Sequence, residues 1–414
     1  MAAARRRVAV VGAGWAGLAC AVGAVRGGAA VTVFEASRGP GGRARTVADS
    51  EPALDNGQHI LIGAYTDTLA LMRAVGAEPD ALLRRLPLSL RFADGGGLAL
   101  PAGAAMPALL KGIVAARGWS WGDRLALLRT AFGWRLRGFR CDPSLTVAEL
   151  CRALPRRVTE ELVEPLCVSA LNTPMAEAGA EVFLRVLRDA LLSTAGGSDL
   201  LLPRVDLDRL LPAPAVRWLR AHRADVRHGR RVMSVQATGA GWSVDGEAFD
   251  RVVLACPPGE AARLAAAWPD WSGDARALRH EPIATVYARC GQGLRRPMLA
   301  LRGGPAQFVF DREQLCGQVG LLAFVASAWQ GERAGLEAGV VLQAREQLGS
   351  AVEPVATLID RRATFACTPG LRRPAAGIAD GLWACGDYVD GPYPATLEGA
   401  VRSGLAAGAS VLRA

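Results

Sequence analysis

Three glycines near the start of the chain have the spacing of a dinucleotide-binding turn. Gly12, Gly14 and Gly17 form the pattern G-x-G-x-x-G between a β-branched run and a run of small, helix-forming residues. In such a turn the first glycine permits a tight bend, the second lets the backbone approach a pyrophosphate, and the third lets helix and sheet pack closely. The helix N-terminus presents free N–H groups and about half a positive charge to the phosphates. The glycines predict binding of an anionic dinucleotide, although the pattern alone also fits a helix–sheet turn without a ligand.

An acidic residue follows this turn at the distance that a dinucleotide requires. Glu35 ends a second apolar run, and seventeen residues separate it from Gly17. A carboxylate at this distance accepts hydrogen bonds from ribose hydroxyls. Residues 8–11, 18–26 and 31–34 are therefore predicted to be the strand, helix and strand of one βαβ unit.

The first 25 residues also have features of a signal peptide or a membrane helix. Three arginines, residues 5–7, precede an apolar run that reaches residue 25. The glycines at fixed offsets and the acidic residue after the run indicate a buried strand, turn and helix instead. No other stretch is apolar over the length that a spanning helix requires. We therefore expect a cytoplasmic protein, soluble or peripheral to the inner face of the cytoplasmic membrane.

The segment after the second predicted strand favours FAD over NAD. It reads Arg38-x-x-Gly41-Gly42-Arg43, and a simple NAD dehydrogenase has no reason to place two glycines and an arginine there. The segment resembles the flavin amine oxidase and carotenoid desaturase superfamily, in which the arginine meets the FAD pyrophosphate and the glycines bring the backbone near the flavin. The resemblance implies that Gly42 and Arg43 bind FAD.

Residues 54–65, L-D-N-G-Q-H-I-L-I-G-A-Y, are similar to one branch of that superfamily. The branch is the squalene-associated FAD-dependent desaturases, whose implied activity is dehydroxylation of hydroxysqualene in hopanoid synthesis. In this setting Gln58 and His59 would stand next to an otherwise apolar site. His59, with Gln58 or Tyr393, is the candidate proton donor for the leaving hydroxyl, while reduced FAD supplies a hydride. The alternative is that Gln58 and His59 only hydrogen-bond the backbone or the flavin.

The last thirty residues complete the cofactor site that the resemblance implies. Asp387 would bond the ribityl and phosphate region of FAD, and a helix beginning near Thr396 would point its N-terminus at the flavin. Val232, in a predicted strand, would contact the adenine through its main chain. The residues expected to bind FAD are Gly12, Gly14, Ala16, Gly17, Glu35, Ala36, Gly42, Arg43, Gly57, Gln58, Val232, Gly386, Asp387, Thr396 and Leu397.

The predicted elements give an α/β fold of two interleaved parts. A Rossmann-like FAD-binding domain of the glutathione-reductase type is expected from residues 1–63, 204–262 and 367–414. An α+β substrate domain of the amine oxidase/desaturase type is expected from residues 64–203 and 263–366. Residues 64–198 lack strand alternation and are predicted to be helical. Strands are predicted at residues 226–235, 251–255, 285–290, 307–310, 318–326, 357–365 and 382–385, with a hairpin near 239–246 and a last helix at 395–412.

The composition narrows the classes of ligand. The formal net charge of +9 comes almost wholly from arginine, because Lys111 is the only lysine. Such a surplus fits an anionic membrane surface or the codon usage of a GC-rich genome, and no nucleic-acid-binding module is visible. The nine cysteines have neither metal-site nor disulfide spacing, so we expect reduced thiols and no metal. Neither Cys367 nor Cys385 has the spacing of a cysteinyl flavin, so we expect noncovalent FAD.

Three other functions fit parts of the sequence. An oxidative carotenoid- or phytoene-type desaturase is the runner-up, although such enzymes usually continue differently at residues 56–59. A flavin amine oxidase that uses dioxygen commonly holds a lysine near the flavin, whereas Lys111 lies in a stretch that we expect at the periphery. A nonenzymatic dinucleotide-binding scaffold would be colourless after purification.

Residues 104–140 combine apolar and basic side chains at helical spacing. Leaving lipid for water would cost a thirty-carbon isoprenoid on the order of 20 kcal/mol, at about 0.8 kcal/mol per CH₂, so its enzyme must meet it in the bilayer. We predict that this region contacts an anionic membrane surface, with Trp119, Trp121 and Trp134 at the lipid. The alternative is that these helices only cap the substrate domain, and that partner enzymes of squalene synthesis hand over the substrate.

Overall fold

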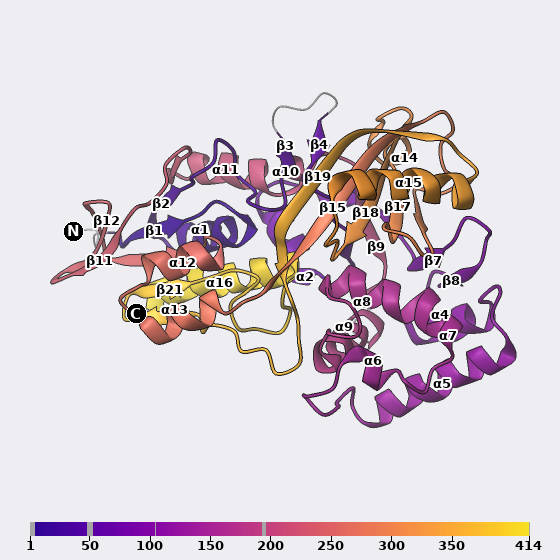
Figure 1. Cartoon of the computed structure of the whole chain (residues 1–414). Coiled ribbons are helices and arrows are strands. Elements are labelled where there is room, and N and C mark those ends of the chain that lie inside the picture. The colour runs from indigo at the N-terminus through magenta and orange to yellow at the C-terminus, as the bar shows by residue number, and fades with distance from the viewer. Residues whose placement is uncertain (1–4, 48–52, 104, 193–195, 414) are drawn as a thin grey trace.

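The computed structural model describes residues 5–47, 53–103, 105–192 and 196–413. Its elements form two parts that lie side by side in Figure 1, a layered α/β part on the left and a part with an antiparallel sheet and a group of helices on the right. The chain passes between these parts several times, so each is built from separated segments.

A six-stranded sheet forms the centre of the left-hand part. Its order is β10-β2-β1-β14-β21-β20, with β20 alone antiparallel to its neighbour. After their first residues, Arg7 and Arg251, the central strands β1 and β14 are apolar and buried. This pattern is typical of parallel strands that are covered by helices on both faces. The strands are β1 (Arg7–Val11), β2 (Ala30–Phe34), β10 (Asp225–Arg227), β14 (Arg251–Leu254), β20 (Gly377–Ala379) and β21 (Leu382–Ala384).

Two helices from opposite ends of the chain pack closely together beside this sheet. They are α1 (Trp15–Arg26) and α16 (Leu397–Arg413). A Cβ on Gly404 would stand 2.1 Å from the carbonyl oxygen of Ala16, and a Cβ on Gly408 would stand 2.7 Å from that of Cys20. The two helices therefore run in the same direction, and both N-termini point toward the same end of the sheet. The other helices of this part are α2 (Thr66–Ala74), α3 (Pro79–Leu82), α10 (Leu207–Leu210), α11 (Pro212–Ala221), α12 (Pro258–Leu264) and α13 (Pro269–Arg276).

The strand predicted at residues 226–235 is wrong for residues 228–234. β10 ends at Arg227, and Gly229 then takes a φ of 66°. The backbone N–H of Arg230 donates to the carbonyl oxygen of Glu35, which folds the chain back over the end of β2. Val232 therefore lies in a buried loop and not in a strand. The predicted hairpin follows as β11 (Val235–Thr238), β12 (Gly241–Val244) and β13 (Glu247–Phe249).

The right-hand part contains a five-stranded antiparallel sheet in the order β16-β17-β18-β15-β19. The strands predicted in this region are present, and β15 and β19 are longer than expected. The sheet consists of β15 (His280–Cys290), β16 (Met298–Ala300), β17 (Phe308–Asp311), β18 (Leu321–Ser327) and β19 (Val352–Phe365), with α14 (Arg312–Cys316) and α15 (Arg333–Leu348) attached.

The helices below this sheet in Figure 1 come from the middle of the chain. They are α4 (Ala105–Val114), α5 (Trp121–Leu136), α6 (Val147–Leu150), α7 (Arg156–Val158), the π-helical turn η1 (Thr159–Val163), α8 (Glu164–Leu171) and α9 (Ala180–Leu192). The expectation that residues 64–198 are wholly helical is wrong. Strands of three or four residues are too short to show alternation. The short strands in and around this region are β3 (Thr46–Val47), β4 (Leu54–Asp55), β5 (Leu61–Ile62), β6 (Leu83–Leu86), β7 (Ser89–Arg91), β8 (Gly97–Ala99) and β9 (Leu200–Pro203).

Two of the three tryptophans predicted at the lipid are buried, so that prediction is wrong for them. Trp119 is 4% exposed and donates its indole N–H to the Glu161 carboxylate at 2.8 Å, and Trp134 is 5% exposed. Trp121 is 71% exposed. Of these three tryptophans, Trp121 is therefore the one available to a surface partner.

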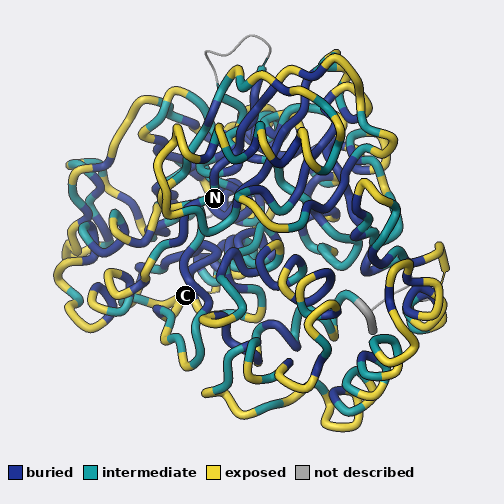
Figure 2. The backbone as a smooth tube through the Cα atoms, turned by 45° about the vertical axis from the view of Figure 1, so that its right-hand side comes forward, coloured by how far each residue is buried: buried dark blue, intermediate teal, exposed yellow. Residues whose placement is uncertain are grey.

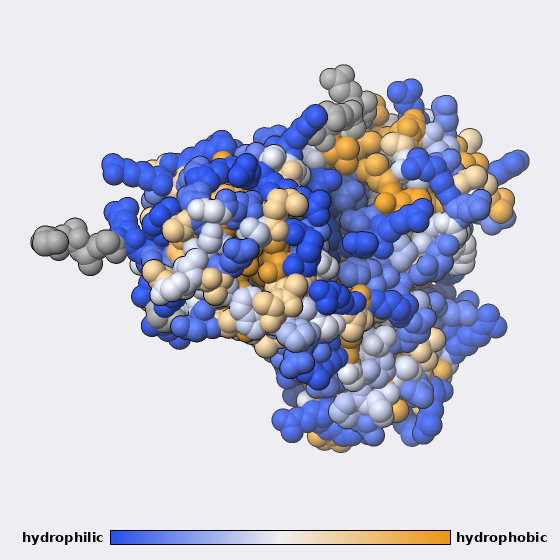
Figure 3. Space-filling model, turned by 60° about the vertical axis from the view of Figure 1, so that its left-hand side comes forward, coloured by the Kyte–Doolittle hydropathy of each residue, from blue (hydrophilic) through white to orange (hydrophobic). Residues whose placement is uncertain are grey.

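In Figure 2 the buried parts of the backbone run through the interior, and the exposed parts lie mainly at the outer turns. The face drawn in Figure 3 is mainly hydrophilic, with apolar residues gathered at the upper right and in a smaller area near the centre. Within the described ranges, no helix has the length and hydropathy needed to cross a bilayer.

Candidate active site

The glycine turn lies at the carboxyl end of β1 and leads into α1. Gly12 has a φ of 115°, and a Cβ there would stand 2.6 Å from the carbonyl oxygen of Ala255. A Cβ on Gly17 would stand 1.9 Å from the carbonyl oxygen of Gly12. At Gly14 a Cβ would meet only the Cα of Gly42, at 3.9 Å, and Gly14 borders a cavity. The fold requires the first and third glycines, whereas the second leaves room for a ligand.

Glu35 is buried at the end of β2, with its carboxylate turned toward this loop. It accepts hydrogen bonds from the backbone N–H groups of Ala13 at 2.7 Å and Ser37 at 2.8 Å, and from the Ser37 hydroxyl at 2.7 Å. Glu35 borders the same cavity, as do Ala16 and Ala36. The carboxylate therefore holds the turn in shape at the place where a ribose contact was predicted.

Arg43 and Asp387, predicted as separate cofactor contacts, form an ion pair in the cavity wall. Arg43 also donates to the carbonyl oxygen of Ala363 at 2.8 Å. Burial alone would lower the pKa of Arg43, but the adjacent Asp387 carboxylate outweighs it and the pKa is raised. The pair joins the two ends of the chain, although the sequence did not indicate that the two side chains meet.

The N-terminus of α16 also opens onto the cavity. Thr396 caps the helix, because its hydroxyl accepts the backbone N–H of Gly399 at 2.9 Å and donates to the carbonyl oxygen of Tyr393 at 2.9 Å. Thr396 and Leu397 border the cavity, as does Gly386. The positive end of the α16 dipole is thus placed where it stabilises negative charge on a ligand.

These groups border one end of a cavity of about 1260 Å³. The other end runs among the helices and the antiparallel sheet of the right-hand part. That end is lined mainly by apolar side chains, among them Leu109, Phe132, Leu162, Phe183, Phe308 and Phe310. A pocket for one drug-sized ligand is commonly 300–1,000 Å³, so this cavity has room for a dinucleotide together with an apolar molecule.

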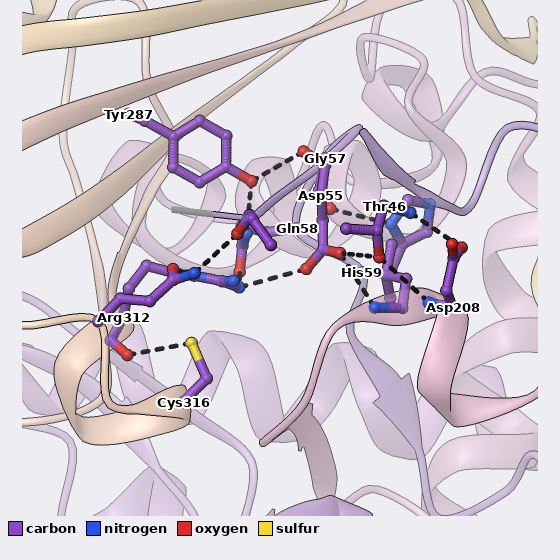
Figure 4. Close-up of polar contacts among 12 residues, drawn as sticks. Thr46, Asp55, Gly57, Gln58, His59, Asp208, Tyr287, Arg312 and Cys316 are labelled. Carbon is purple, nitrogen blue, oxygen red and sulfur yellow. Dashed lines mark hydrogen bonds and ion pairs between the residues drawn. The ribbon is translucent and has the colours of Figure 1, made fainter. Parts of the chain in front are cut away.

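A buried polar network, which the sequence did not predict, fixes the segment between the two ends of the cavity (Figure 4). The Arg312 guanidinium pairs with the Asp55 carboxylate at 3.4 Å, and its Nη1 also donates to the Gln58 side-chain oxygen at 3.2 Å. Gln58 donates to the Tyr287 hydroxyl at 3.0 Å, and that hydroxyl donates to the Asp55 carbonyl oxygen at 2.9 Å. Burial raises the pKa of Asp55, and the Arg312 charge opposes that rise. Residues 55–58 are therefore held by side chains more than 200 positions away in the chain.

The network changes the interpretation of Gln58. Its oxygen is used by Arg312 and its nitrogen by Tyr287, although the residue borders the cavity. Both partners are side chains, whereas the alternative drawn from the sequence named the backbone or the flavin. We therefore assign Gln58 a positioning role beside Gly57.

His59 borders the cavity and has a defined protonation pattern. Its Nδ1 lies 3.2 Å from the carbonyl oxygen of Gly57. A carbonyl oxygen only accepts, so Nδ1 carries the hydrogen and Nε2 is unprotonated in the neutral ring. Burial lowers the pKa of His59, and the Arg43 charge lowers it further.

Tyr393 stands at the cavity wall just before α16. The Arg402 guanidinium carbon lies 5.0 Å from its ring centroid. Burial raises the pKa of Tyr393, and the Asp189 carboxylate adds to that rise. Tyr393 therefore keeps its proton at neutral pH and remains a candidate donor. Val232, at the other end of the cavity, accepts a hydrogen bond from Arg263 at 2.8 Å through its carbonyl oxygen.

Residues 15–412 match the profile of flavin-containing amine oxidoreductases. The chain belongs to this family. It is a flavin-dependent oxidoreductase, and the glycine turn, Glu35 and the α16 N-terminus are the parts of the cavity suited to the cofactor. In the described ranges, no cluster of three or more His, Cys, Asp or Glu side chains could hold a metal ion, and the nine cysteines are free thiols.

Relatives of this oxidoreductase include full-length and partial matches. Hydroxysqualene dehydroxylase from Rhodopseudomonas palustris is 27% identical over 99% of both chains, and that from Sinorhizobium fredii is 27% identical over 96% of both. Hydroxyneurosporene desaturase from Rhodobacter capsulatus is 41% identical over 81 residues, which is 20% of this chain and 16% of its own. The crystal structure of an oxidoreductase from Methanosarcina mazei shares the fold, with a TM-score of 0.73, 16% identity, and coverage of 97% of this chain and 99% of that one.

Proposed function

We propose that this oxidoreductase binds FAD noncovalently and reduces hydroxysqualene to squalene. The observation that carries the proposal is one cavity that joins a dinucleotide-binding end to an apolar end. The full-length similarity to two hydroxysqualene dehydroxylases supports the choice of substrate.

The residues at the polar end fit FAD. Gly14 leaves space for a pyrophosphate, and α1 and α16 direct parallel N-termini toward it. The buried Tyr388 hydroxyl borders the same wall and has no hydrogen-bond partner in the described structure. These groups would hold the pyrophosphate, the ribose and the flavin ring.

The reaction needs a proton on the leaving oxygen and a hydride at the carbon that loses it. Reduced FAD, when bound, supplies the hydride, and the hydroxyl leaves as water. His59 is our candidate for the proton, from Nε2, because Nδ1 is engaged with Gly57. The donating form is the imidazolium, which a lowered pKa makes scarce at neutral pH.

This assignment predicts a pH dependence. A histidine whose pKa lies below its usual value of 6.5 gains its proton only as the pH falls below 6.5. The kcat should therefore rise as the pH falls through that pKa. His59→Gln should lose this acid limb and about 10²–10⁴-fold in kcat, while keeping its flavin absorbance. A His59→Gln variant with an unchanged pH profile would exclude His59 and favour Tyr393.

Noncovalent attachment predicts that acid precipitation releases all of the flavin into the supernatant. Cys256 borders the cavity, but burial raises its pKa to about 12, so it remains an unreactive thiol. Cys367 has a pKa raised to about 12 for the same reason. A yellow pellet after precipitation would show covalent attachment.

An oxidative carotenoid-type desaturase is the second candidate, because of the local similarity to hydroxyneurosporene desaturase. That similarity spans a fifth of the chain, whereas the dehydroxylases match along nearly all of it. Purified protein, reduced and kept anaerobic, should convert hydroxysqualene to squalene. Failure of this conversion, with conjugated products formed from a polyene substrate instead, would favour the desaturase.

A further inference from the structure

Helix α5 has two apolar faces, and only one is covered. Leu127 and Trp134 are each 5% exposed and pack into the core. On the other side lie four residues that we call the apolar stripe, with exposed fractions of 71%, 58%, 62% and 72%: Trp121, Leu125, Phe132 and Leu136. At 3.6 residues per turn these positions share an arc of about 60°. Figure 1 shows α5 at the outer edge of the helical group.

The surroundings of the apolar stripe are basic. Residues 105–140 contain seven basic side chains and one acidic side chain, Asp123, which is used in the capping box with Ser120. By the same helical geometry, Arg129 and Arg135 flank the stripe on opposite sides. The guanidinium carbon of Arg124 lies 4.7 Å from the Trp121 ring centroid. The exposed basic side chains are Lys111, Arg117, Arg129, Arg135, Arg137 and Arg140.

The apolar stripe is also continuous with the cavity. Phe132 is 62% exposed and lines the cavity, and Leu110 on α4 is 48% exposed and lines it too. Val114, one turn further along α4, is 49% exposed. The apolar end of the cavity therefore meets the surface between α4 and α5, next to the stripe.

We propose that the apolar stripe and its basic flanks dock on an anionic phospholipid bilayer, with the cavity opening toward the lipid between α4 and α5. Apolar side chains enter the acyl boundary of a leaflet while arginines contact the phosphates, which is how an interfacial helix binds. A second copy of the chain is the alternative partner for the apolar stripe. It would bring two strongly basic surfaces together across a twofold axis, so the charge favours the anionic lipid.

The experiment is flotation of the purified flavoprotein with phosphatidylcholine vesicles, with and without phosphatidylglycerol. The test variant is Trp121→Gln with Leu125→Gln and Leu136→Gln, three stripe residues that do not line the cavity. The matched control carries three exposed apolar residues changed to glutamine elsewhere: Val319, Leu342 and Val355. Wild type and control should float with anionic vesicles, and the test variant should bind at least about tenfold more weakly. Arg129→Gln with Arg137→Gln should lose about fivefold per arginine, on anionic vesicles only.

Two results would overturn the docking surface. One is equal vesicle binding by the test variant and wild type. The other is an absence of binding together with a dimer in analytical ultracentrifugation that the test variant abolishes, which would make the stripe a self-association surface. The proposal that the cavity opens toward the lipid rests on the proposed function. Turnover assays test membrane docking and the proposed reaction separately. The test variant should keep its kcat with hydroxysqualene in detergent micelles and lose it with vesicles. Vesicle binding without conversion in either medium would contradict the proposed function alone.

Discussion

Replacing Gly14 with valine is expected to give a folded protein without bound flavin. Gly14 has a φ of −71° and a ψ of 178°, which valine adopts without strain, and its Cβ would meet only Gly42 at 3.9 Å. The valine methyls would then occupy the space into which the pyrophosphate fits. Overpacking of about 3 kcal/mol corresponds to a loss of more than a hundredfold in FAD affinity. Flavin absorbance after purification, with circular dichroism for the fold, measures this.

Two further glycine variants serve as controls for Gly14→Val. Gly335→Val, on an exposed helix where a Cβ would meet nothing within 4 Å, should retain its flavin. Gly17→Ala should fail to fold, because its Cβ would stand 1.9 Å from a backbone oxygen. A Gly14→Val protein with stoichiometric FAD would show that the turn has only a structural role.

Replacing Arg312 with methionine is expected to lower the free energy of unfolding by about 3–5 kcal/mol, the usual cost of removing one partner of a buried ion pair. Both side chains of the pair are almost fully buried, with Arg312 1% and Asp55 2% exposed. The change leaves the Asp55 carboxylate without its cation and the Gln58 oxygen without its donor. Urea unfolding followed by fluorescence measures the loss, and FAD affinity should fall with it because residues 55–58 lose their support.

The protonation of Asp55 determines how the stability of Arg312→Met changes with pH. Burial raises the pKa of this carboxyl in the folded state, so its charged form is disfavoured there, and removing Arg312 raises the pKa further. The stability difference between Arg312→Met and wild type should therefore shrink as the pH falls and Asp55 takes up a proton. The double variant Arg312→Met with Asp55→Asn should be more stable than Arg312→Met alone. A double variant that is no more stable would mean that Arg312 acts through packing and not through its charge.

The two ends of the chain were predictable because their patterns are local. The glycine turn, the strand–helix–strand unit and the last helix each follow from spacing within a few tens of residues. The middle of the chain was not predictable from local patterns, because β6, β7 and β8 are short strands that pair with distant or equally short strands. The path of residues 228–234 depends on hydrogen bonds to residues 35 and 37. No local sequence pattern indicates these hydrogen bonds.

The orientation of α5 could not be predicted from the sequence either. Its sequence is apolar on two faces, and periodicity alone does not say which face is buried. The fold places Leu127 and Trp134 inward and Trp121 outward, because α5 contacts α4 and α7 and its inner face joins the hydrophobic core. The ion pair between Asp55 and Arg312 was equally unpredictable from the sequence, because 257 positions separate the two residues.

A single anaerobic turnover in heavy water shows whether reduced flavin transfers a hydride to hydroxysqualene. The flavoprotein is reduced in D₂O, mixed with one equivalent of hydroxysqualene, and followed by flavin absorbance and by mass spectrometry of the product. One flavin should be oxidised for each squalene formed, and the squalene should carry one deuterium at the carbon that held the hydroxyl. Unchanged reduced flavin with intact hydroxysqualene, or squalene formed without flavin oxidation, would contradict it.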